Sequence, residues 1–201
     1  MPMSTSFYPI LTFEEYKLSP SLGYFFKRQW LDPCESVVSI LWKFAHMNRL
    51  PGHMVVAHVA KRQTDPYEGL AATATELDVR RMAGTLGLTQ KAIRFAMHRP
   101  ELRRGWCSEL RICPRCMSRG YHGVVHQFGG ILNCPVHGCR LETACRSCGA
   151  TSEYIIKAEV LDAPFRCPNC RRNYGNTLAS FVNRVPLLPR DRAAIFRAFI
   201  G

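Results

Sequence analysis

The chain has 201 residues, with 27 Lys and Arg against 15 Asp and Glu, a formal net charge of +12 and a pI near 9.5. This length suits one large or two small domains, and a hydrophobic content of 47% supports a buried core. No stretch is long enough to span a membrane, so we expect no membrane partner. The basic balance indicates a polyanionic partner, most simply nucleic acid, although a basic surface that only keeps the chain soluble is the alternative.

Residues 1–31 are rich in aromatic side chains and interrupted by Pro and Ser. We expect an irregular N-terminal arm, with short helical turns over 12–18 and 22–29, that packs on the body of the protein or docks onto a partner. Its start has no basic segment followed by an apolar run, so we expect a cytoplasmic protein with reduced thiols. The aromatic residues are Phe7, Tyr8, Phe13, Tyr16, Tyr24, Phe25, Phe26 and Trp30.

Residues 32–106 carry helical patterns and are predicted to form a mainly α-helical domain. Asp32 is a suitable cap for a helix over 32–48, and Pro33 suits its first turn. Further helical patterns cover 53–63 and 75–98. The first of these helices has a core-facing stripe made of Val37, Val38, Ile40, Leu41, Phe44, Ala45 and Met47.

Residues 78–100 predict two helices joined by a tight turn. Gly87 is a suitable left-handed stop for the first helix, and Thr89 is a suitable cap for the second. Helix, Gly-containing turn and helix form the helix-turn-helix layout, in which the start of the second helix meets the DNA groove. A helical hairpin with a solvated polar face is the alternative. The predicted DNA-contacting residues of the second helix are Thr89, Gln90, Lys91 and Arg94.

A basic stripe follows this helix pair over residues 80–119. It has ten basic side chains against two acidic ones, and nine of the ten are Arg, whose planar guanidinium suits phosphate oxygens and guanine edges. Arg103 and Arg104 are therefore added to the predicted DNA contacts. The ten are Arg80, Arg81, Lys91, Arg94, Arg99, Arg103, Arg104, Arg111, Arg115 and Arg119.

Four metal-binding hooks, each with two residues between its ligands, follow over residues 113–170. The hooks are Cys113 and Cys116, Cys134 and His137, Cys145 and Cys148, and Cys167 and Cys170. Intervals of 17 residues (117–133) and 18 residues (149–166) separate the hooks of each pair. This spacing is typical of structural, tetrahedral zinc and predicts two Zn²⁺ per chain in a zinc-binding region over 107–175. We expect a Cys₃His unit over 113–137 and a Cys₄ unit over 145–170, each built on a small β-hairpin.

Other readings of the ten cysteines are disulfides, buried free thiols, an iron–sulfur cluster, catalytic zinc and a RING-like interleaving of the hooks. Thiols that stay reduced argue against disulfides, and the paired C-x₂-C spacing suits shared ions better than free thiols. An iron–sulfur cluster is disfavoured because His137 replaces a thiolate and the hooks pair off evenly. Four protein ligands leave no open position for catalysis. Seven bound thiolates and two Zn²⁺ would leave a net charge of about +9.

Several Cys and His residues fall outside the hooks. His122 and His126 lie between the first two hooks, and we expect polar packing or surface roles for them, with ligand substitution as the alternative. Cys139 is expected to be a thiol beside the ligands or simple filler, and Cys34 a plain thiol. Residues 176–201 are predicted to be a tail with a short helix from near Pro189.

Three stretches of the chain resemble the TniQ/TnsD family of transposon target-selection proteins. The first is PCESVVSILWKFAHMN, in which Lys43 stands where the family has Arg, and the second is LGLTQKAIRFAMHRP before the hooks. The third comprises Cys113, Cys116, Cys134, His137, Gly138, Leu141, Cys145, Cys148 and Gly149. The resemblance covers about residues 30–172, and CPVHG with CRSCG is its most specific part.

The resemblance implies a bacterial mobile-element protein without catalytic activity. Such proteins recognise DNA or a guide-RNA effector complex and recruit an AAA+ transposition ATPase. The fold expected is a mainly α N-terminal helix-turn-helix domain followed by two tandem, small, β-rich zinc-ribbon-like units. We therefore predict a non-catalytic target-selection adaptor in DNA transposition. The alternative is a zinc-stabilised protein–protein interaction module, a transposition regulator without direct DNA binding.

Overall fold

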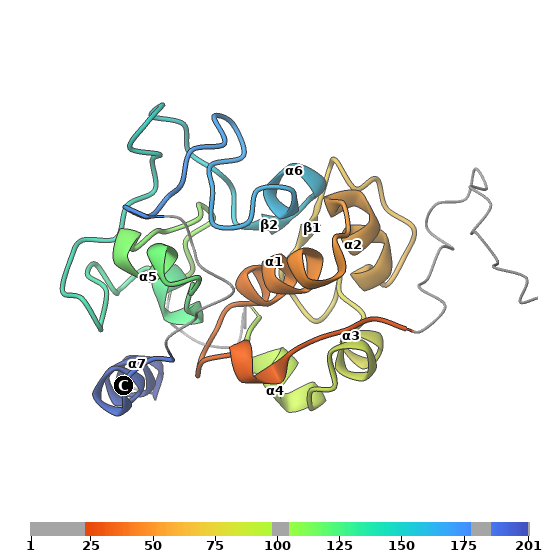
Figure 1. The fold of residues 1–201 in the computed structure, drawn as a ribbon, viewed down its shortest axis with the longest axis horizontal. Coiled ribbons are helices and arrows are strands. Elements are labelled where there is room, and N and C mark those ends of the chain that lie inside the picture. The colour runs from red at the N-terminus through yellow and green to blue at the C-terminus, as the bar shows by residue number, and fades with distance from the viewer. Residues whose placement is uncertain (1–22, 98–104, 178–185, 201) are drawn as a thin grey trace, which may run out of the picture.

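A computed structural model describes residues 23–97, 105–177 and 186–200 (Figure 1). The first 22 residues of the predicted arm, as well as Arg103 and Arg104, lie outside the described residues. The described part is α+β, and its two strands, β1 (Leu70–Ala71) and β2 (Ile155–Ile156), form a small antiparallel sheet. The described residues also form the 3₁₀ helices η2 (Arg28–Trp30) and η3 (Val124–Gln127). The α-helices are α1 (Val37–Asn48), α2 (Gly52–Val59), α3 (Val79–Leu86), α4 (Gln90–Phe95), α5 (Pro114–Ser118), α6 (Ala158–Leu161) and α7 (Pro189–Ile200).

Helix α1 lies at the centre of the molecule (Figure 1), and residues 37–45 are all buried. A helix that is buried on every side needs its polar ends satisfied from within the protein. The predicted cap, Asp32, is wrong: Ser36 caps the helix and accepts a hydrogen bond of 3.2 Å from the backbone N–H of Ser39. Cys34 has a left-handed φ of 54°, so the helical backbone begins only after it. Asp32 instead accepts a hydrogen bond from the backbone of Leu187.

Helices α3 and α4 and the turn between them lie where the sequence predicts them. Gly87 has a φ of 61°, the left-handed conformation that ends α3. The hydroxyl of Thr89 accepts a 3.1 Å hydrogen bond from the backbone N–H of Ala92 and so caps α4. The two helices and their caps are therefore confirmed, whereas their use as a DNA-binding helix-turn-helix stays a prediction.

The region of the second metal hooks packs into the core of the helical part. Strand β2 pairs with β1 in the register Leu70↔Ile156, and α6 packs against α1 and α2. The indole N–H of Trp42 in α1 donates a 2.6 Å hydrogen bond to the carbonyl of Val160, and its ring lies 4.7 Å from that of Phe165. One hydrophobic cluster therefore contains residues of both the predicted helical domain (32–106) and the predicted zinc-binding region (107–175).

The β-hairpins expected between the hooks are wrong. Residues 117–133 contain the end of α5 and the 3₁₀ helix η3, while β2 pairs with the distant β1. The reason is burial: residues 120–128 are buried without a break. A two-stranded hairpin on a surface exposes alternate side chains, so it cannot bury nine consecutive residues.

A charged pair is buried at the start of α1. The Lys43 ammonium contacts the Glu35 carboxylate and donates a 2.7 Å hydrogen bond to the Trp30 carbonyl. The Ser39 hydroxyl donates a 2.6 Å hydrogen bond to the same carboxylate, and the backbone of Asp32 donates to its other oxygen. Both charges therefore have partners that replace water, which a buried ion pair requires.

Replacing Lys43 tests this arrangement. Lys43→Met leaves the Glu35 carboxylate buried without its counter-charge, and we expect a loss of about 3–5 kcal/mol in the free energy of unfolding, measured by urea titration of metal-saturated protein. Arg146→Met is the matched control, because Arg146 pairs with Glu142 on the surface and its side chain is 58% exposed. The control should lose less than about 1 kcal/mol, and equal losses would contradict the buried-pair account.

Two glycines test the contact between α2 and α6. A Cβ at Gly52 would lie 2.2 Å from the carbonyl oxygen of Ala158, whereas one at Gly84 in α3 meets no atom within 4 Å. Gly52→Ala should therefore cost about 1–3 kcal/mol by overpacking. Gly84→Ala should stabilise by up to about 1 kcal/mol through helix propensity. Thermal unfolding of both variants measures the difference, and a stabilised Gly52→Ala protein would refute the close packing of these helices.

Candidate metal centres and nucleic-acid interface

The first candidate metal centre gathers Cys113, Cys116, Cys134 and His137 within 4.8 Å of one another. The Nδ1 atom of His137 lies 3.4, 3.3 and 3.6 Å from the sulfurs of Cys113, Cys116 and Cys134. The sulfurs of Cys116 and Cys134 are 3.6 Å apart. A tetrahedral ion with metal–sulfur bonds near 2.3 Å separates its ligand sulfurs by about 3.8 Å, so the group has the size of a zinc site.

The second candidate centre gathers Cys145, Cys148, Cys167 and Cys170. The sulfur of Cys145 lies 3.7 Å from that of Cys170, and the sulfur of Cys148 lies 3.8 Å from that of Cys167. These separations also match a tetrahedral site. The structure thus brings the eight predicted ligands together in two groups that are sequential along the chain.

Three of the four hooks share one backbone geometry. In each, the N–H of the first ligand donates to the carbonyl of the residue five positions later: Cys134 to Cys139 at 2.8 Å, Cys145 to Ala150 at 2.9 Å and Cys167 to Arg172 at 2.9 Å. The residue after the second ligand is left-handed in all three, with φ values of 64° at Gly138, 74° at Gly149 and 60° at Arg171. This tight turn aims both ligands at one point.

The first hook is built differently. Cys113 stands at the N-cap of helix α5, and Pro114 occupies the first helical position, where its missing N–H costs nothing. Cys116 follows within the first turn of that helix. The hook therefore presents its two sulfurs from a helix start rather than from the left-handed turn of the other three.

The chemistry of the donors fits a metal ion. Cysteine sulfurs and imidazole nitrogen suit zinc, and neither centre draws on a carboxylate. Several thiolates this close together would repel one another without a cation between them. Both groups could therefore hold a metal ion.

The spare cysteines are not equivalent. The sulfur of Cys139 lies 3.4 Å from that of Cys113, so this thiol sits beside the ligands, as one of the two readings of the sequence expects. The shared backbone geometry places Cys139 at the position that Ala150 and Arg172 occupy in the other hooks, which argues against a ligand role. Burial raises the pKa of the Cys34 thiol to about 11, so it stays protonated and unreactive near neutral pH.

His122 and His126 are both fully buried. His122 lies between the Ser36 hydroxyl, 2.7 Å from its Nδ1, and the carbonyl of Arg111, 3.0 Å from its Nε2. Burial, followed by the neighbouring His126, lowers the pKa of His122 to about 3, so the ring is neutral. The carbonyl must accept from Nε2–H, and Nδ1 then accepts from the Ser36 hydroxyl. The expected polar packing is confirmed for His122, whereas His126 faces the ligand sulfurs.

The predicted DNA contacts on α4 are exposed. Thr89, Gln90, Lys91 and Arg94 all lie at the surface, although the Thr89 hydroxyl is already used as a helix cap. The basic stripe is shorter than predicted, because Arg111 is buried and donates to the carbonyls of Phe128 and Ile131. Two more of its arginines are in ion pairs with Asp78 and Asp191, namely Arg81 and Arg119. The described stripe residues that stay exposed outside such pairs are Arg80, Lys91, Arg94 and Arg115.

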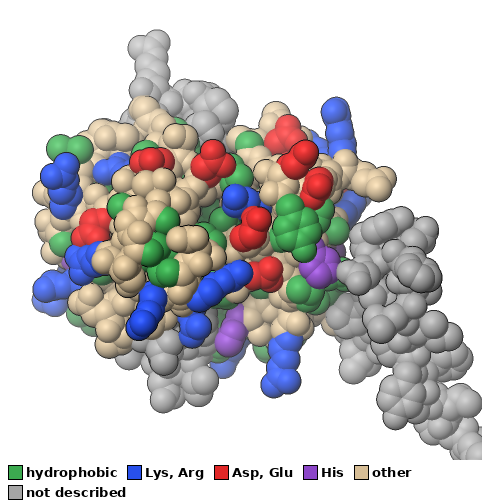
Figure 2. Space-filling model, turned by 90° about the horizontal axis from the view of Figure 1, so that it is seen from above, with side chains coloured by type: hydrophobic (Ala, Val, Ile, Leu, Met, Phe, Trp, Pro, Cys, Tyr) green, Lys and Arg blue, Asp and Glu red, His purple; other side chains and the backbone are tan. Residues whose placement is uncertain are grey.

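The face opposite α3 and α4 carries side chains of both charges. Figure 2 views the molecule from the α6 side and shows Asp and Glu side chains interspersed with Lys and Arg side chains on this face. Asp162, directly after α6, is exposed, as are Asp65 and Glu68. Charge alone therefore does not distinguish this face from the side of α4.

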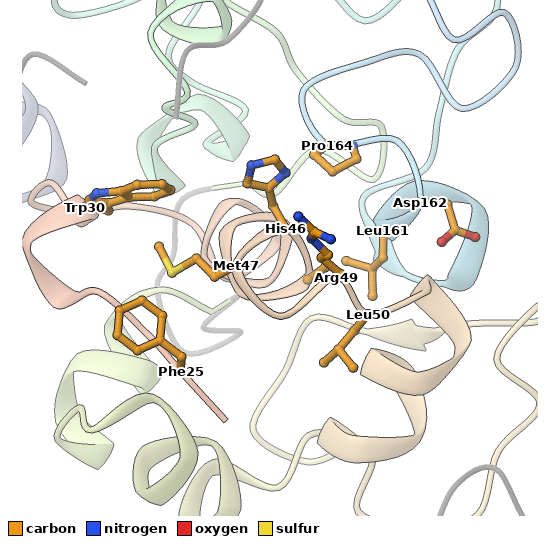
Figure 3. A pocket seen from close by; sticks show the side chains of 10 residues that line it. Phe25, Trp30, His46, Met47, Arg49, Leu50, Leu161, Asp162 and Pro164 are labelled. Atoms are coloured by element: carbon orange, nitrogen blue, oxygen red, sulfur yellow. The ribbon is translucent and has the colours of Figure 1, made fainter. Parts of the chain in front are cut away.

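A groove of about 540 Å³ lies between the end of α1 and α6 (Figure 3). His46, Met47 and Arg49 project from α1 and the residue after it, and Leu161 and Asp162 come from α6 and the residue after it. Desolvation, followed by Arg49, lowers the pKa of His46. The lining mixes apolar, basic and acidic groups, so it does not select one class of ligand.

The fold and the candidate metal centres define a small α+β protein with two cysteine-rich ligand groups beside a buried central helix. A family model described as TniQ matches residues 28–141, which include α1 to α5 and the first centre. The chain therefore belongs to the TniQ family. Proteins of this family are non-catalytic adaptors associated with target selection in transposition. No curated protein matches the chain.

Among the described residues, every helix is too short or too polar to cross a lipid bilayer.

The metal centres predict a defined stoichiometry. Elemental analysis of the purified chain should give two zinc ions, and Cys134→Ser should give one, because three remaining ligands hold the ion poorly. Cys139→Ser is the matched control beside the same centre and should keep both ions. A loss of zinc from Cys139→Ser equal to that from Cys134→Ser would show that the ligand assignment is wrong.

Proposed function

We propose that this protein is a zinc-stabilised, non-catalytic target-selection adaptor in DNA transposition, acting in the bacterial cytoplasm. In this role it binds duplex DNA through α3 and α4 and recruits an AAA+ transposition ATPase. The observation that carries the proposal is the match to the TniQ family over α1 to α5, because that family is associated with transposition. A guide-RNA effector complex is a further partner that the family resemblance suggests.

The DNA-binding half of the proposal is supported by the surface of α4. Gln90, Lys91 and Arg94 are exposed at a helix that follows a Gly-containing turn, as in a recognition helix. Arg94 can donate two hydrogen bonds to guanine or to a phosphate, and Lys91 can contact a phosphate.

Zinc is the ion proposed for both centres. Seven Cys and one His form two four-ligand groups with tetrahedral spacing, and four protein ligands leave no position for a catalytic water. The ions would fix the positions of loops that contain little regular secondary structure. Their role is to hold surfaces in place for partners.

A protein–protein interaction module without DNA contact is the second candidate. Large apolar side chains on α7 and in the N-terminal segment favour it, because Phe196 is 54%, Ile200 64% and Phe25 63% exposed. Exposed aromatic and aliphatic side chains of this size are common at protein interfaces. The two candidates are compatible, since α4 and α7 can serve different partners.

DNA binding separates the candidates. We expect the zinc-loaded chain to bind a duplex at low salt, with affinity that falls steeply as salt rises, measured by fluorescence anisotropy. The double variant Lys91→Ala/Arg94→Ala removes two phosphate contacts and should reduce the slope of log K against log [salt] by about 2. Arg166→Ala/Arg172→Ala is the charge-matched control, because both arginines are exposed on the second metal unit and should leave the slope unchanged.

Two results of this experiment would contradict DNA binding through α4. Absence of duplex binding at low salt would remove the DNA half of the proposal and leave the interaction module. An equal loss of slope in both double variants would show that binding follows net charge rather than α4.

A further inference from the structure

His126 is a buried histidine that contacts the first candidate metal centre without belonging to its four ligands. It lies in η3, its exposed fraction is 0%, and its Nε2 atom is 3.8 Å from the sulfur of Cys116 and 3.7 Å from that of Cys134. Those two sulfurs are 3.6 Å apart, so His126 stands over one edge of the ligand group. His137 occupies the remaining corner, with its Nδ1 within 3.6 Å of three ligand sulfurs.

The hydrogen bonds around His126 indicate which of its nitrogens carries the proton. The backbone N–H of Gly123 donates a 3.2 Å hydrogen bond to Nδ1. An Nδ1 that accepts a hydrogen bond has a free lone pair, so the proton of a neutral imidazole must be on Nε2. That N–H points at the sulfurs of Cys116 and Cys134. A nitrogen that carries a proton cannot at the same time be a metal ligand.

With zinc bound, the first centre would carry a negative charge, which the Nε2–H of His126 can stabilise. Three thiolates, one neutral imidazole and Zn²⁺ sum to a net charge of −1, and this charge lies among buried residues. A buried negative charge is costly unless hydrogen-bond donors surround it. Donation of one N–H to two thiolate sulfurs spreads that charge and fixes the direction of both ligands.

We propose that His126 is a positioning residue of the first metal centre, donating its Nε2–H to the zinc-bound thiolates of Cys116 and Cys134. The inference rests on the proposed zinc loading of this centre and is independent of DNA binding. His126 is thus a fifth side chain that supports the metal site, as a hydrogen-bond donor to two of the four ligands.

Residues 122–126, which include His126, connect the first candidate metal centre to the start of α1. The rings of His126 and His122 are 5.1 Å apart, and His122 contacts the Ser36 hydroxyl that caps α1. The backbone N–H of Ser36 also donates a 2.8 Å hydrogen bond to the carbonyl of His122, and the N–H of Val124 donates to Cys34. Through these contacts, a change in the direction of His126 reaches the N-terminus of the central helix.

Chelator competition on the full chain tests the proposal. His126→Phe keeps a ring in the buried space but removes the donor, and it should weaken zinc binding at one of the two centres by 10- to 100-fold. His126→Gln restores an N–H donor and should recover part of the loss. The second centre serves as an internal reference, because its affinity should stay unchanged in both variants.

Cobalt substitution distinguishes a positioning residue from a ligand. Co²⁺ in the His126→Phe protein should keep the visible absorption of a tetrahedral Cys₃His site, whereas His137→Phe should change it. If His126→Phe changes the cobalt spectrum and His137→Phe does not, His126 is the ligand and the proposal is overturned. If His126→Phe binds zinc as tightly as the unchanged chain, the hydrogen bonds do not matter and the proposal also falls.

A measurement on the unchanged sequence covers the case in which the variants do not fold. In protein loaded with ¹¹³Cd, the Nε2–H proton of His126 should show scalar coupling to the metal across the N–H···S hydrogen bond. A His126 ¹⁵N spectrum with the proton on Nδ1 would overturn the proposal. A chain that binds no metal at the first centre would instead refute the zinc loading itself, so the two failures are distinguishable.

Discussion

The ion pair between Lys43 and Glu35 is the constraint on which the rest of the fold depends, because it lies where the central helix is buried on every side. Glu35 is held by three donors, including the Ser39 hydroxyl, so the pair is fully satisfied without water. With these charges balanced, α1 can serve as the common support of the molecule. Burial thus explains four polar residues of the segment that resembles the family signature: Glu35, Ser36, Ser39 and Lys43 are buried and stabilise a core helix.

The two metal centres relate differently to that support. Cys145 and Cys167 belong to the same hydrophobic cluster as α1, whereas Cys113, Cys116 and Cys134 belong to a second cluster beside α7. Loss of an ion from the second centre would therefore disturb the main core directly. Loss from the first would act through η3 and its contacts with the start of α1. This arrangement makes the two candidate ligand groups part of the hydrophobic clusters.

The proposed adaptor has different surfaces for its different partners. The basic residues of α4 lie on the side of the molecule opposite α6, and the α6 face carries Asp and Glu interspersed with Lys and Arg (Figures 1 and 2). Helix α7 packs against η3 and against α4 through Phe95 and Phe199, whose rings are 5.4 Å apart, while Phe196 stays exposed. A partner docked on α7 would therefore lie next to the first metal centre and the proposed DNA-binding helix.

Much of the secondary structure and the grouping of the metal ligands could be predicted from the sequence, because both depend on residues that are close along the chain. The helices α1, α3, α4 and α7 and the grouping of the eight ligands follow from capping residues, apolar periodicity and C-x₂-C spacing, which act over a few residues. Only the tertiary structure decided what distant segments do together. It pairs β1 with β2 in place of the expected hairpins, buries Arg111 out of the basic stripe and turns His126 towards the sulfurs of Cys116 and Cys134. No spacing rule encodes these contacts, because each depends on how a continuous buried run fills the space beside α1.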